Sequence, residues 1–104
     1  MDSIRKWTTP TQTFVIEGVD LTSADVYVTM AQGDVTTTFS GDDITVTYDG
    51  DNTTVALPLT QAITGGFSTD STIAVQVNWM SEGQRNATTI EYIKVQKNLY
   101  DETI

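Results

Sequence analysis

The sequence predicts an all-β domain, folded as a sandwich of about seven short strands in two sheets. Apolar and polar side chains alternate with the two-residue period of a strand in several segments, most clearly in residues 72–80. Threonine, present twenty times, and valine have branched β-carbons, which suit a pleated sheet better than a helix. Turns containing glycine and aspartate separate the segments at near-regular spacing, and this favours a sandwich over a closed barrel.

The first half of the chain contains most of the expected strands. In residues 12–17 the side chains of Phe14 and Ile16 share one face, which is the pattern of a strand with one buried side. The same alternation recurs between turns further along the chain. These further strands are expected over residues 24–32, 35–40, 44–48 and 53–59.

A short helical turn is expected over residues 59–67, as a crossover between strands. Thr60 can cap its first turn, and Gly65 can end it in the left-handed conformation. The strand over residues 72–80 follows and is expected to be central. Its core face is formed by four apolar side chains: Ile73, Val75, Val77 and Trp79.

The last strand, expected over residues 86–96, changes phase along its length. Thr88, Ile90 and Tyr92 indicate one inward face, whereas Ile93 indicates the other. A two-residue period cannot change faces without an extra residue, so we predict a β-bulge or a change of sheet near Tyr92 and Ile93. Burial on both faces is the alternative.

Charge and composition exclude several classes of protein. A net charge of −9 leaves no basic face to neutralise a run of phosphates, so we expect no nucleic-acid partner. The same charge repels anionic lipid headgroups, and no apolar run approaches the roughly 20 residues of a membrane span. No apolar stretch of signal-peptide length follows residues 1–7, so synthesis in the cytoplasm is expected.

Candidate catalytic and metal-binding residues are few. Histidine and cysteine are absent, which removes the usual general base and the thiol nucleophile, so we expect no enzymatic activity and no cofactor. A pair of carboxylates, as in glycosidases, is the remaining catalytic option. Calcium takes oxygen ligands from loops such as Asp42–Asp43 and residues 49–52, but hairpin turns select the same residue types, and we expect solvated turns.

The two ends are expected to flank the sandwich of residues 12–97 as an extended arm, residues 1–11, and a tail, residues 98–104. Either the ends fold back over their own sheets, or they contact a neighbouring subunit or another protein. Basic residues in the arm and acidic residues in the tail favour the second hypothesis. The expected interface residues are Ile4, Arg5, Lys6, Trp7, Leu99, Tyr100, Asp101, Glu102 and Ile104.

Four segments carry a resemblance to a known group of proteins. They are Val19-Asp20-Leu21-Thr22, residues 59–67, Val75-Gln76-Val77-Asn78-Trp79 and Asn98-Leu99-Tyr100-Asp101-Glu102. With these segments the sequence resembles small immunoglobulin-like β-sandwich proteins of tailed bacteriophages, including the type found in upper baseplate proteins.

The resemblance implies an antiparallel immunoglobulin-like sandwich and a noncatalytic component of the virion. Such a protein would act at the head–tail junction, tail or baseplate, as a homo-oligomer in contact with other phage structural proteins, after synthesis in the bacterial cytoplasm. The alternative is an immunoglobulin-like binding module that recognises a carbohydrate or protein on a host cell surface.

Overall fold

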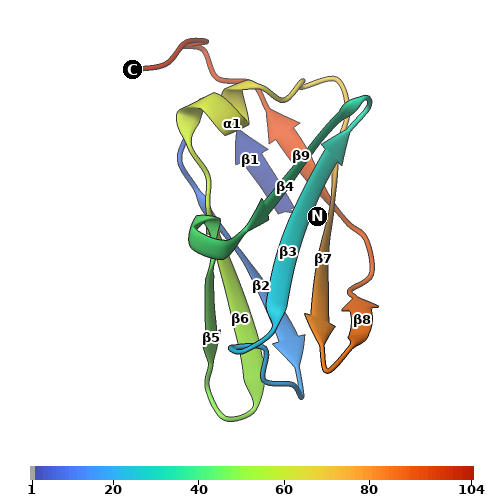
Figure 1. Cartoon of the computed structure of the whole chain (residues 1–104). Helices are drawn as coiled ribbons and strands as arrows, with labels where there is room; N and C mark the ends of the chain where they lie inside the picture. Colours follow the sequence, from blue (N-terminus) through green and yellow to red (C-terminus); the bar gives the residue numbers. More distant parts are fainter. Residues whose placement is uncertain (1) are drawn as a thin grey trace.

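Two β-sheets pack face to face around one core (Figure 1). The computed structural model describes residues 2–104, so Met1 of the expected arm lies outside it. The strands are β1 (Asp2–Arg5), β2 (Thr11–Glu17), β3 (Asp25–Gln32), β4 (Val35–Ser40), β5 (Thr45–Tyr48), β6 (Asn52–Pro58), β7 (Ile73–Ser81), β8 (Gln84–Ala87) and β9 (Glu91–Gln96). A helix, α1 (Gln61–Gly65), and a 3₁₀ turn, Gly41–Asp43, complete the described elements.

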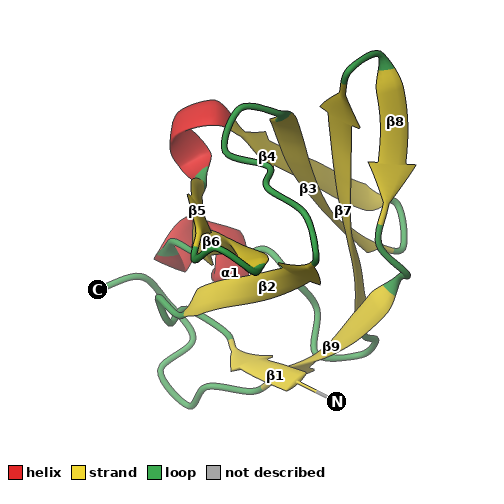
Figure 2. Cartoon of the chain, turned by 90° about the horizontal axis from the view of Figure 1, so that it is seen from below, coloured by secondary structure: helices red, strands yellow, loops and turns green. Residues whose placement is uncertain are grey.

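The strand order confirms the predicted all-β sandwich. The larger sheet has the order β1-β9-β7-β3-β4, with β8 also paired to β7, and the smaller sheet has the order β2-β6-β5. The smaller sheet therefore corresponds to strands B, E and D of the immunoglobulin arrangement, while β3, β7 and β9 correspond to C, F and G. Figure 2 shows the smaller sheet lying against the curved larger one.

The first strand is the main departure from the expected architecture. Asp2–Arg5, expected to be part of an extended arm, forms β1 and pairs parallel with β9, so Ile4 lies opposite Val95. The larger sheet is therefore mixed, and the described chain has nine strands where about seven were expected. Four residues are too few for a period-2 pattern to be recognised in the sequence.

The core lies between the inner faces of the two sheets. Val28 of β3 is paired with Val77 of β7, and both side chains are buried, which confirms the burial predicted for Val77. Trp79, expected in the same buried row, is half-buried near the end of β7 and packs against the edge of the core. The central role predicted for residues 72–80 is confirmed, since β7 pairs with β3, β8 and β9.

A β-bulge interrupts the edge of the larger sheet between β8 and β9. Asn78 of β7 pairs with Ala87, and Val75 of β7 pairs with Glu91. The three residue steps from Val75 to Asn78 therefore lie opposite four steps from Ala87 to Glu91, which leaves one extra residue between β8 and β9. The side-chain oxygen Oγ1 of Thr88 accepts a hydrogen bond from the Val77 N–H at 3.1 Å within this gap. The predicted extra residue exists, but it lies before Glu91 and not at Tyr92, and Tyr92 faces solvent where an inward face was expected.

Candidate functional site

The segment that follows β1 meets the start of the C-terminal tail beside α1, at one end of the sandwich (Figure 1). The Lys6 N–H donates to the Gln96 carbonyl at 3.0 Å, which extends the pairing of β1 with β9. The Arg5 guanidinium donates to the Lys97 carbonyl at 2.5 Å, and the Asn98 side-chain amide donates to the Lys6 carbonyl at 3.0 Å. The first residues of the described chain therefore hold the start of the tail in place.

Trp7 is the centre of this contact. Its backbone has φ of 67°, which is unusual for a bulky residue, and its ring lies directly against Gly65 of α1. The indole N–H donates to the Asp101 carboxylate at 2.5 Å. The Lys6 ammonium is 3.8 Å from the same carboxylate and 5.8 Å from the centre of the Trp7 ring. We call Lys6, Trp7, Gly65, Asn98 and Asp101 the terminal cluster.

The structure divides the expected interface residues into three groups. Ile4 is 2% exposed and belongs to the core, so its expected place in an interface is wrong. Arg5, Lys6, Trp7 and Asp101 contact the chain's own opposite end, which is the arrangement given by the hypothesis that the ends fold back. The third group projects into solvent: Leu99, Tyr100, Glu102 and Ile104.

The tail presents apolar side chains although its backbone is held in place. Leu99 is 94% exposed and Ile104 is 98% exposed, whereas Tyr100 is 56% exposed. The Ile104 N–H donates to the Gln61 side chain at 2.8 Å, and the Tyr100 N–H donates to the Asn98 side chain at 3.2 Å. Polar contacts thus fix the tail while its apolar groups face outward.

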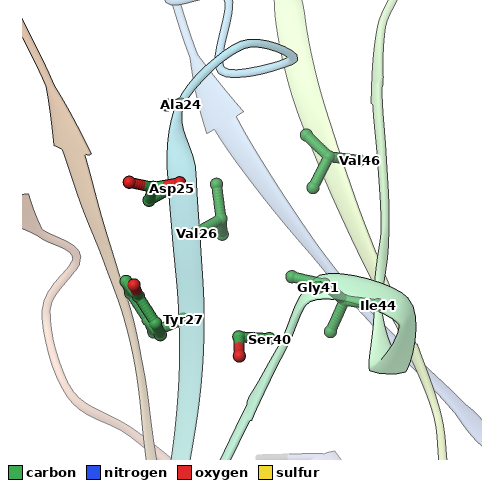
Figure 3. A pocket seen from close by; sticks show the side chains of 8 residues that line it. All are labelled: Ala24, Asp25, Val26, Tyr27, Ser40, Gly41, Ile44 and Val46. Carbon is green, nitrogen blue, oxygen red and sulfur yellow. The ribbon is translucent and has the colours of Figure 1, made fainter.

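A second candidate site surrounds Tyr27 on β3, which is 42% exposed. Figure 3 shows Val26 pointing toward Ile44 and Val46, whereas Asp25 and Tyr27 point to the other side of β3. A cavity of about 340 Å³ lies on the first side. A cavity of about 440 Å³ on the outer face is lined by Asp25, Tyr27, Thr29, Thr38, Asn78, Trp79, Met80 and Arg85.

The acidic turns use their carboxylates locally. The Asp49 carboxylate accepts hydrogen bonds from the N–H groups of Asn52 at 2.8 Å and Asp51 at 2.9 Å, and these bonds hold its pKa below the ordinary value of 3.8. The hydroxyl and N–H of Thr22 lower the pKa of Asp20 in the same way. Within residues 2–104 no group of three or more carboxylates gathers to share a metal ion.

Two features of these sites could not be predicted from the sequence: the packing of Gly65 against Trp7 and the exposure of Tyr27. Gly65 was expected to end a helical turn through positive φ, but it is the last residue of α1 and lacks a positive φ, and the helix is capped by Gly66 at φ of −79°. Its role is to leave room for the Trp7 ring. The exposure of Tyr27 beside a cavity depends on the pairing of β3 with β4 and β7, which the alternation within β3 does not specify.

Fold and site together define a small immunoglobulin-type β-sandwich with an anchored, apolar tail. Comparison with protein-family models gives no match, and comparison with curated proteins gives none either. No helix within the described chain has the length and apolar character needed to cross a membrane.

Proposed function

We propose that this chain is a noncatalytic structural protein that assembles through protein–protein contacts made by its tail. The observation that carries the proposal is the exposure of Leu99 and Ile104 on a backbone held by hydrogen bonds. Apolar side chains fixed in solvent bind a partner at a lower entropy cost than the same side chains on a free tail. The neighbouring Glu102 adds a negative charge suited to a basic surface.

The setting proposed for this assembly is the virion of a tailed bacteriophage, at the head–tail junction, tail or baseplate. Its support is the resemblance of the four sequence segments to phage immunoglobulin-like proteins. In this setting the partners are copies of the chain and other phage structural proteins. Repetition of one contact between identical subunits gives a ring when the rotation closes.

Charged residues in place of the tail's apolar groups should abolish assembly and preserve the fold. We expect Leu99→Asp combined with Ile104→Asp to convert ordered oligomers to monomers in sedimentation velocity. Both side chains are almost fully exposed, so the free energy of unfolding should change by no more than about 0.5 kcal/mol.

Val35→Asp is the matched control, because Val35 is a 50% exposed apolar residue on β4, outside the tail. It should assemble like the wild type. Oligomers that persist in the double variant, or a wild type that stays monomeric at every concentration, would contradict assembly through the tail.

The second candidate function is recognition of a host-surface carbohydrate by the outer-face cavity beside Tyr27. An exposed aromatic ring, together with the polar groups of Asp25, Asn78 and Arg85, is a combination that can stack on a sugar and hydrogen-bond its hydroxyls. Arg85 is positioned by Asn78, whose side-chain oxygen accepts from Nη2 at 3.3 Å.

Tyr27→Ala should then remove binding on a glycan array without changing the melting temperature, because the lost ring is half in solvent. Tyr92→Ala is the control: Tyr92 is 53% exposed on the same sheet but does not line this cavity. A wild type that binds no glycan, or equal binding by both variants, would exclude the cavity as a carbohydrate site.

A further inference from the structure

One long strand of the smaller sheet has a backbone edge without a partner. β2 pairs with β6 on one side, and no other strand within residues 2–104 pairs with it. In the immunoglobulin arrangement, strand A lies beside strand B, which corresponds to β2. Here β1 pairs with β9 in the other sheet, so the described chain places no strand in that position.

The hydrogen-bond register shows which backbone groups face the open side. The Leu59 N–H donates to the Pro10 carbonyl at 2.9 Å, and the Gly18 N–H donates to the Asp51 carbonyl at 3.0 Å. Hydrogen-bonded pairs recur at every second residue of an antiparallel ladder. The even-numbered residues of β2 therefore bond to β6, and the open side receives the N–H and C=O groups of the odd-numbered ones: Thr11, Thr13, Val15 and Glu17.

The edge of β2 lacks the features that usually block strand addition. Its register with β6 is continuous from Thr11 to Glu17, so it has no bulge. It contains neither lysine nor proline, which natural proteins place on exposed edges, and Val15 is 61% exposed. β4 is also an uncharged edge strand, but each of the two cavities beside it touches a single β4 residue, Thr38 or Ser40.

A cavity lined by both apolar and polar residues opens beside the middle of β2. It has a volume of about 270 Å³ and lies where the bulge between β8 and β9 interrupts the larger sheet. Its lining residues are Thr13, Phe14, Val15, Val75, Gln76, Val77, Thr88 and Glu91. A strand added to β2 would direct every second side chain toward the inner layer, where this cavity can receive one.

We propose that the open edge of β2 binds an extended, basic segment of another protein, which adds a fourth strand to the smaller sheet. Main-chain hydrogen bonds to Thr13 and Val15 provide the pairing, and the cavity receives an apolar side chain of the added strand. This surface is separate from the tail, so it adds a second contact to the assembly function proposed above.

The charges near the open edge of β2 indicate which kind of segment would bind there. The only charged residue lining the cavity is Glu91, and the only one in β2 is Glu17. The chain as a whole carries −9, so a segment of another protein with lysine or arginine at its solvent-facing positions complements this edge better than a segment of a second copy.

Amide hydrogen exchange of the full chain tests the site, with a short synthetic peptide that alternates valine and lysine as the probe. In the free protein the amides of Gln12, Phe14 and Ile16 should exchange slowly and those of Thr13 and Val15 quickly. Adding the peptide should slow Thr13 and Val15 by about tenfold or more, and leave the amides of β4 unchanged. A peptide that alternates valine and glutamate should have no such effect.

A pair of variants separates pairing from folding. Thr13→Pro removes an N–H on the open side and leaves the bonds to β6, so it should weaken peptide binding by about tenfold while the protein stays folded. Thr13→Val keeps that N–H and should bind like the wild type.

Three results would overturn the proposal: unchanged exchange at Thr13 and Val15 with the lysine peptide, equal protection by both peptides, or equal binding by the two variants. Protection that grows with protein concentration in the absence of peptide would identify a second copy as the occupant. None of these results at β2 changes the expected outcome of the tail experiment. The contact at β2 and the contact through the tail are therefore tested independently.

Discussion

Ile4→Ala is expected to lower the free energy of unfolding by about 2–5 kcal/mol. The Ile4 side chain is 2% exposed and packs in the core between the two sheets, so its removal leaves a cavity at the place where β1 joins β9. Urea unfolding followed by circular dichroism measures the change. The loss should appear as a lower midpoint at an unchanged slope.

Ser3→Ala is the matched control, because Ser3 is the adjacent residue of β1 and its side chain is exposed. It should change stability by no more than about 0.5 kcal/mol. If Ile4→Ala were equally mild, β1 would be a dispensable arm. A deletion of the first residues would then spare the fold, as it would for an extended arm over residues 1–11.

Gly65→Ala is expected to displace the Trp7 ring and disrupt the terminal cluster. A methyl group at Gly65 would lie 2.2 Å from the ring atoms Cε3 and Cζ3 of Trp7, which is well inside contact distance. The ring must move, and the bond from its N–H to Asp101 is lost with it. We expect a cost of about 1–3 kcal/mol and a shift of Trp7 fluorescence, measured with Trp79→Phe as the background.

Gly66→Ala provides the comparison, since it adds the same methyl group one residue later. The nearest atoms to that methyl would be the carbonyl oxygens of Ala62 and Ile63 at 3.4 Å, and φ of Gly66 is −79°. This variant should keep the fluorescence and stability of the wild type. Equal effects of the two substitutions would mean that Gly65 serves helix geometry and not the packing of Trp7.

The regular strands could be predicted because their information is local. Alternation alone predicts β7 and the burial of Val75 and Val77 on its inner face. β1 could not be found in this way, because its strand character comes from pairing with β9, some ninety residues further along the chain. The bulge was predicted from the change of phase, but its position depends on the contacts of Thr88 with β7.

The residues of the candidate site could be selected from the sequence, but their contacts with one another could not. Trp7 and Asp101 were both selected from the sequence, but as contacts to other molecules, and the structure joins them to each other. Their proximity follows from the parallel pairing of β1 with β9, which no local pattern encodes. The exposed Leu99 and Ile104 lie in a segment without periodicity, so only the structure gives their exposure.

The pairing of β1 with β9 also fixes an order of events during synthesis. Asp2–Arg5 leaves the ribosome before the other described elements, yet its partner strand ends at Gln96. Closing so long a loop is entropically costly, so β1 docks after the local hairpins of the two sheets have formed. Until then, one edge of β9 and the inner surface that Ile4 covers are open to solvent, and the newly made protein exposes apolar surface that the finished one hides.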